Sequence, residues 1–321
     1  MNVRSSGPRC GLESAASILN GVHEDFWISK QGSSKIDGIE LVRIKREERK
    51  QRLCFSSRPF VLCGLPVRKP PAGQLMHERR NGHFVLQITG HPTFGVPFGQ
   101  DRIVPIFLAT LAVQQKSQTI RFRTAAEMLD TFGMHRGGKE YRRLVAAFER
   151  IFGATIFFGS DSMTGRARVV QRSRFNFLSE AQIWYNRSPD QRVLGDEFEN
   201  VIALSDDFYD EVVRHPVPND LDAVKTLAAS PAILDLYMWL SYRCFKAERA
   251  ESIPIFGEFG LASQLGSVEY SRPRRFRAML DQWLGTIRAL WPDCPARISV
   301  DGECLIVAHS EAVLPLQDPP P

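Results

Sequence analysis

Four arginines fall within the six positions 272–277, in the stretch SRPRRFRAMLDQWLG. Apolar residues follow at the spacing of one helix face, so the stretch predicts an amphipathic helix that begins near the arginines. The partial positive charge at a helix N-terminus disfavours cations. Arginine carries a planar fork of donors that fits a phosphate group or the O6 and N7 atoms of guanine. The stretch is therefore either a solvated helix face or a helix that contacts a strongly anionic partner.

A second stretch, KEYRRLVAAFERIFG, has the same pattern. When Tyr141 is set against Phe276, apolar residues coincide at offsets of three, four and seven positions, as on one side of a helix. The face opposite Tyr141 and its flanks carry Arg136, Lys139, Arg142, Arg143, Ala146 and Arg150. The face opposite Phe276 and its flanks carry Arg272, Arg274, Arg275, Arg277, Ala278 and Asp281.

Small residues at the centre of each basic face let a helix approach a base edge closely. Two such helices in one chain favour recognition helices in the DNA major groove over solvated faces. A predicted strand after the first helix adds alternating arginines that would follow backbone phosphates: Arg166, Arg168, Arg172 and Arg174. Among these, Arg166 and Arg168 are predicted DNA contacts.

The elements around both helices occur in one order: helix, strand, helix, turn, helix and β-hairpin. This order predicts an α+β fold with tandem winged-helix domains, each a helix-turn-helix with a hairpin wing. We expect an N-terminal extension at 1–80, partly disordered with a basic helix. The first winged-helix domain is expected at 81–218, and the second at 219–321.

Composition excludes several other classes of protein. The 321 residues carry a net charge of +5, without a CxxC pair, paired histidines, a nucleotide-binding glycine motif or a membrane-spanning apolar run. Acidic residues at 206–211 follow Ser205, which indicates the start of a helix rather than a metal site. We expect a cytoplasmic protein that is not an enzyme and has no catalytic, cofactor or metal site.

Four stretches carry a family resemblance: FGVPFGQDRIVPIFLATLAVQQKSQTIRFRTAAEMLDTFG, YRRLVAAFERIFGATIFFG, LDLYMWLSYRCF and FGLASQLG. The sequence resembles plasmid-encoded RepA-type replication initiators from about position 58 to 305. The resemblance implies binding to double-stranded DNA repeats at a plasmid origin, origin opening, and recruitment of the host replicative helicase and initiator proteins. It also implies a homodimer that represses the initiator's own gene, with residues 174–185 as a candidate contact.

Two alternatives belong to other classes. A winged-helix transcriptional repressor would use the same DNA-binding helices at a promoter only. A rolling-circle origin nickase would need a tyrosine nucleophile and a metal held by two histidines. The chain has no HxH motif, and Tyr141 lies on the apolar side of its predicted helix.

Overall fold

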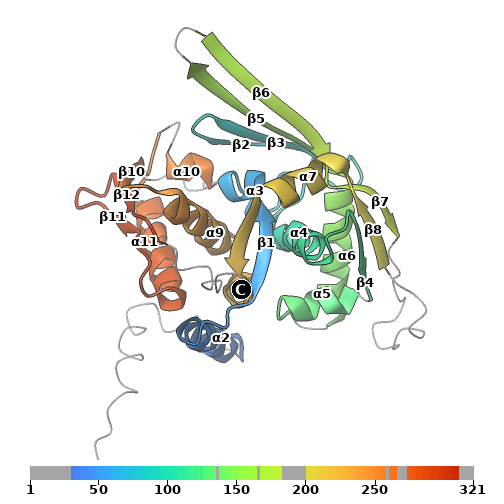
Figure 1. Cartoon of the computed structure of the whole chain (residues 1–321), viewed down its shortest axis with the longest axis horizontal. Coiled ribbons are helices and arrows are strands. Elements are labelled where there is room, and N and C mark those ends of the chain that lie inside the picture. Colours follow the sequence, from blue (N-terminus) through green and yellow to red (C-terminus); the bar gives the residue numbers. More distant parts are fainter. Residues whose placement is uncertain are drawn as a thin grey trace, which may run out of the picture.

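The computed structural model describes residues 30–123, 125–134, 137–164, 167–182, 200–257, 260–265 and 273–310. Helices and strands are mixed along the chain (Figure 1), so the predicted α+β class is confirmed. The N-terminal part contains α2 (Lys30–Glu47), β1 (Leu53–Ser57), α3 (Arg58–Leu62), β2 (Met76–Asn81) and β3 (Phe84–Thr89).

The predicted first unit contains η2 (Gly99–Arg102), α4 (Ile103–Gln115), β4 (Thr119–Phe122), α5 (Ala125–Thr131), α6 (Gly138–Phe152), β5 (Thr155–Thr164) and β6 (Ala167–Asn176). It is followed by β7 (Leu178–Gln182), β8 (Asn200–Leu204), α7 (Asp206–Arg214), β9 (Pro216–Asp220) and α8 (Leu221–Leu227). The hydroxyl of Ser205 accepts a hydrogen bond from the Phe208 amide at 3.2 Å, which confirms that the acidic run begins a helix.

The predicted second unit contains α9 (Pro231–Lys246), β10 (Glu251–Pro254), α10 (Leu261–Gln264), α11 (Pro273–Leu290), β11 (Arg297–Ile298) and β12 (Cys304–Val307). Both units thus have the predicted order of helix, strand, two helices and hairpin. Their sheets differ. In the second unit β10 pairs with β12, which pairs with β11. In the first unit β4 pairs with β8, while the hairpin β5–β6 is extended by β3 and β2.

The domain boundaries expected at 80/81 and 218/219 do not coincide with breaks in this fold. Asn81 ends β2, which pairs with β3 in the four-stranded sheet. Pro218 lies within β9 and pairs with Phe55 of β1. Strands β1 and β2, within the expected extension, therefore pair with strands of the rest of the chain. The pairing of β1 with β9, more than 150 positions apart, leaves no local signal in the sequence.

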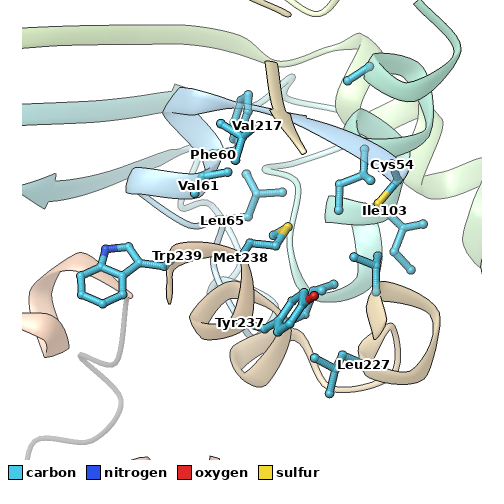
Figure 2. Close-up of a cluster of buried hydrophobic side chains, with 14 of the residues drawn as sticks. Cys54, Phe60, Val61, Leu65, Ile103, Val217, Leu227, Tyr237, Met238 and Trp239 are labelled. Atoms are coloured by element: carbon cyan, nitrogen blue, oxygen red, sulfur yellow. The ribbon is translucent and has the colours of Figure 1, made fainter. Parts of the chain in front are cut away.

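Helix α9, the first helix of the second unit, also packs against α3, β9 and η2 of the preceding part of the chain (Figure 1). Figure 2 shows Met238 directed toward Leu65, while Trp239 points to a different side of the helix, at the left of the view. Both side chains are at most 3% exposed. The Trp239 indole donates a hydrogen bond to the Gln264 side chain of α10 at 3.1 Å. The buried apolar side chains of both units therefore form one continuous core around α9.

The basic helix α2 is anchored to this core. Lys45 contacts the Asp222 carboxylate at 2.7 Å, and Arg46 lies 3.4 Å from the Asp220 carboxylate. Arg46 also donates a hydrogen bond to the Tyr237 hydroxyl at 3.1 Å and stacks over Trp291. These two cations are internal ion-pair partners, so the basic character of this helix does not mark a free surface. Across the described part of the chain, no helix is long and apolar enough to cross a membrane.

The buried side chain of His77, in β2, should make the stability of the fold depend on pH. It is 7% exposed, and its Nε2 lies 3.4 Å from the Gly64 carbonyl. Burial, helped by the charges of Arg79 and Arg102, lowers the pKa of His77 to about 4 from the usual 6.5. Between these values the unfolded chain binds a proton that the folded chain does not. The free energy of unfolding should therefore fall by roughly 3 kcal/mol as pH drops through this window.

The measurement is urea denaturation across pH 4–7 for the wild type and His77→Gln. The variant should lose this component of the pH dependence. His83→Gln, at an exposed histidine two residues after β2, is the control and should keep it. Identical pH profiles for the wild type and His77→Gln would show that His77 is not held neutral by the fold.

Candidate nucleic-acid interface

Helix α6 presents a basic face to solvent because its opposite face is buried. Leu144, Ala147, Phe148 and Ile151 are each at most 5% exposed. Their spacing of three and four positions is that of one helix stripe. The helix begins after Gly137, whose extended backbone (φ −85°, ψ 156°) turns the chain into the first turn.

Lys139, Arg142 and Arg143 lie on the exposed side of α6, with Ala146 half-buried one turn further on. These four positions follow the spacing i, i+3, i+4 and i+7, so they share one face. Among the described residues, none of the three cations has a hydrogen-bond or ion-pair partner. The face can therefore donate several charge-assisted hydrogen bonds to an anion.

Arg150, which was predicted to belong to this basic face, has a partner inside the protein instead. Its Nε and Nη2 atoms lie 2.6 and 2.9 Å from the two oxygens of Asp101, and its guanidinium stacks over Phe98. Only 16% of the Arg150 side chain and 6% of the Asp101 side chain are exposed. The Arg150 guanidinium thus has an ion-pair partner within the protein, unlike the cations of the exposed face. Residue spacing correctly predicted the position of Arg150 on the helix. It contains no information about η2, which supplies the partner Asp101.

Helix α11 has a similar arrangement. Pro273 occupies its start, where the missing amide hydrogen costs nothing. Phe276, Leu280, Trp283 and Ile287 form part of its buried stripe. The side chains on the exposed side are Arg274, Arg275, Ala278 and Asp281. The first turn contains no acidic residue, so nothing on α11 itself offsets the two arginines near its N-terminus.

Arg277, also a predicted contact, turns toward the hairpin. It forms an ion pair with Glu303 and stacks over Phe256 at 5.5 Å. Its side chain is 31% exposed. It braces α11 against the loop between β11 and β12, so the structure assigns Arg277 a partner that the helical pattern did not reveal.

The hairpin β5–β6 extends away from the body of the molecule (Figure 1). Arg168 pairs in register with Met163, and Arg174 pairs with Phe157. The Arg174 side chain is exposed and stacks over the Phe157 ring at 5.9 Å. Arg136, Arg166 and Arg272 lie outside the described residues. Of the candidate dimer segment 174–185, the described part ends β6 and forms β7, at the edge of the β4–β8–β7 sheet.

Sequence reasoning missed a buried ion pair that joins η2, which contacts α6, to α9. Arg102 and Asp235 are each 4% exposed and form an ion pair with an Nε–Oδ1 distance of 2.7 Å. Burial raises the pKa of Asp235 to about 6, although the Arg102 guanidinium opposes this shift. The available signal was a lone charge inside an apolar helix, as in PAILDLYMWL, because such a charge needs a buried partner.

Residues 96–253 match the RepA_C family, described as "Plasmid encoded RepA protein". This segment belongs to the plasmid-encoded RepA family. The match confirms the resemblance to RepA-type plasmid replication initiators. It includes η2, α6 and α9 and ends before α11.

Two solved structures are similar to the chain. The crystal structure of a selenomethionine derivative of domains 2 and 3 of RctB is 15% identical, with a TM-score of 0.48. The alignment covers 77% of this chain and 95% of that one. A second structure of RctB domains 2–3 is 14% identical, has a TM-score of 0.46, and covers 77% and 94%. No curated protein matches the sequence.

The two classes of arginine on α6 should differ in their effect on stability. Arg150→Ala leaves the nearly buried Asp101 carboxylate without its cation, so we expect a loss on the order of 3 kcal/mol in the free energy of unfolding. Arg143→Ala removes an exposed side chain and should change it by less than about 0.5 kcal/mol. Urea denaturation followed by circular dichroism measures both values. Equal losses for the two variants would contradict this division.

Proposed function

We propose that this protein is a plasmid replication initiator that binds repeated sites at its origin through two tandem winged-helix units. In this proposal α6 and α11 are the recognition helices, each lying in a major groove. Lys139, Arg142, Arg143 and Ala146 form the first contact surface. Arg274, Arg275, Ala278 and Asp281 form the second.

The observation that supports this most is the pair of exposed basic helix faces at equivalent places in both units. Each face lies opposite a buried apolar stripe, and each helix precedes a β-hairpin. A single basic face is commonly only solvated. Two such faces in a chain whose segment 96–253 belongs to the RepA family are better explained by DNA.

The hairpins differ in what they offer DNA. Sheet order β10–β12–β11 in the second unit supports its assignment as a winged helix, and Arg277 and Glu303 hold its short hairpin close to α11. The first hairpin, β5–β6, has ten residues in each strand and carries arginines at positions 168, 172 and 174. We assign it to phosphate contacts beside the groove that α6 occupies.

The proposal includes origin opening and recruitment of the host helicase and initiator proteins, without a catalytic step by this chain. A monomer with two recognition helices needs no symmetry in its target, so direct repeats are the expected sites. A homodimer would account for a palindromic operator at the initiator's own gene.

Footprinting on the origin DNA of its own plasmid tests the function. Monomeric protein should protect two major-groove segments about 10–10.5 base pairs apart, centre to centre. With about six phosphates contacted, the plot of log affinity against log salt concentration should have a slope near −5. Protection at a promoter only would favour the repressor, and a slope shallower than about −2 would exclude the basic helices from the interface.

Substitutions should separate base recognition from phosphate contact. Arg143→Ala or Arg274→Ala should weaken binding by roughly 1–3 kcal/mol and relax the base preference at one position. Arg174→Ala, on the β5–β6 hairpin, should weaken binding to all sequences about equally. Binding to a panel of single-base site variants measures both effects. A similar loss of specificity from all three variants would contradict the assignment.

A further inference from the structure

Two adjacent residues of opposite charge in η2 connect elements of both units. Asp101 binds Arg150 of α6, and Arg102 binds Asp235 of α9. We call the series Arg150–Asp101–Arg102–Asp235 the charge chain. It joins α6, the proposed first recognition helix, to α9, the first helix of the second unit. The two ion pairs are connected because Asp101 and Arg102 are consecutive residues of η2.

The link to α6 has a defined geometry. Arg150 contacts both oxygens of Asp101, at 2.6 and 2.9 Å. The same carboxylate accepts a hydrogen bond from the Phe98 amide at 2.9 Å. A two-point contact between a guanidinium and a carboxylate fixes orientation as well as distance. The last turns of α6 are thereby held in one rotational position against η2.

The link to α9 is more deeply buried. Arg102 lies 2.7 Å from one oxygen of Asp235 and donates a hydrogen bond to the other at 2.9 Å. It also donates to the Leu65 carbonyl at 2.9 Å and to the Gly99 carbonyl. A Cβ at Gly64 would lie 2.5 Å from the Asp235 carboxylate, so the place of this carboxylate requires a residue without a side chain.

Stability alone does not account for this arrangement. Removing charges from water is costly, and well-packed apolar residues of similar volume commonly stabilise a fold as much as a buried ion pair. The gain from the ion pairs is geometric: each fixes the angle between two elements that apolar packing would hold less specifically. The second unit continues rigidly from α9, because Trp239 is hydrogen-bonded to α10 and α11 packs beside α9.

We propose that the charge chain sets the separation and rotation of α6 relative to α11, and with it the spacing between the two DNA segments that the protein accepts. Asp101, Arg102 and Asp235 are then positioning residues that determine site specificity without touching DNA. The inference rests on the proposed function, in which both helices enter major grooves.

The first test measures discrimination between sites of different spacing. The full chain is titrated with its origin repeat and with duplexes that have one base pair inserted or deleted between the two protected segments. One base pair rotates the second segment by about 35°. The wild type should discriminate against both altered duplexes. Discrimination is the dissociation constant for an altered duplex divided by that for the origin repeat. In Asp101→Asn and Asp235→Asn, which keep side-chain volume, this ratio should fall about fivefold or more.

A second measurement needs no DNA. Bioorthogonal spin labels at the exposed positions Glu149 of α6 and Gln282 of α11 report the distance between the two helices in the full chain. The wild type should give a narrow distance distribution, and both asparagine variants a broader or shifted one. This result also shows the effect of the charge chain if the protein fails to bind its origin.

Glu211→Gln provides the matched control. Glu211 forms a partly exposed ion pair with Arg58 at 3.3 Å, which joins α7 to α3 and includes no residue of η2, α6 or α9. This variant should lose stability but keep the wild-type spacing discrimination and distance distribution. Unchanged discrimination and distances in the asparagine variants, or equal changes in Glu211→Gln, would overturn the inference. Failure of the wild type to bind the origin repeat would instead count against the proposed function.

Discussion

Burial of α9 on all sides is the constraint on which the rest of the structure depends. Leu234, Leu236, Tyr237, Met238, Trp239 and Leu240 are each at most 3% exposed. A helix that is apolar around its whole circumference has to be enclosed by other elements. One side of α9 meets α3, β9 and η2, and another meets α11 and β12. Because interiors are packed to near-crystalline density, α9 cannot shift without disturbing both units.

This constraint also explains how the basic residues are divided. A buried or half-buried arginine requires a carboxylate, and the fold supplies Asp220, Asp235, Asp101 and Glu303 for Arg46, Arg102, Arg150 and Arg277. The arginines of the exposed faces of α6 and α11 have no such partner among the described residues. Positive charge is thus neutralised where it holds elements together and left uncompensated on two helix faces. That distribution fits a polyanion better than the net charge of +5 alone would indicate.

The two units have the same order of helices and strands, but their strands pair differently. β10 completes the sheet of its own hairpin, whereas β4 pairs with β8 and leaves the first hairpin to β3 and β2. The first hairpin therefore belongs to a sheet that also includes β2, and β2 packs against α10 of the second unit. The sheet that contains the β5–β6 hairpin thus also contributes to the contact between the units.

The sequence by itself determined what depends on neighbours within a few positions. The stripes of α6 and α11 repeat at three and four residues, so their buried and exposed sides could be predicted, including Arg143 and Arg274 on the exposed side. The Ser205 cap and the order of elements were equally local. Tertiary structure decided which strands pair and which charges meet. Arg150 and Arg143 look alike on a helical wheel, and only the distant Asp101 separates them. Likewise, β1 pairs with β9 across more than 150 residues. Strand pairing and ion-pair partners depend on which surfaces meet in the folded chain. The periodicity of a short segment therefore cannot predict them.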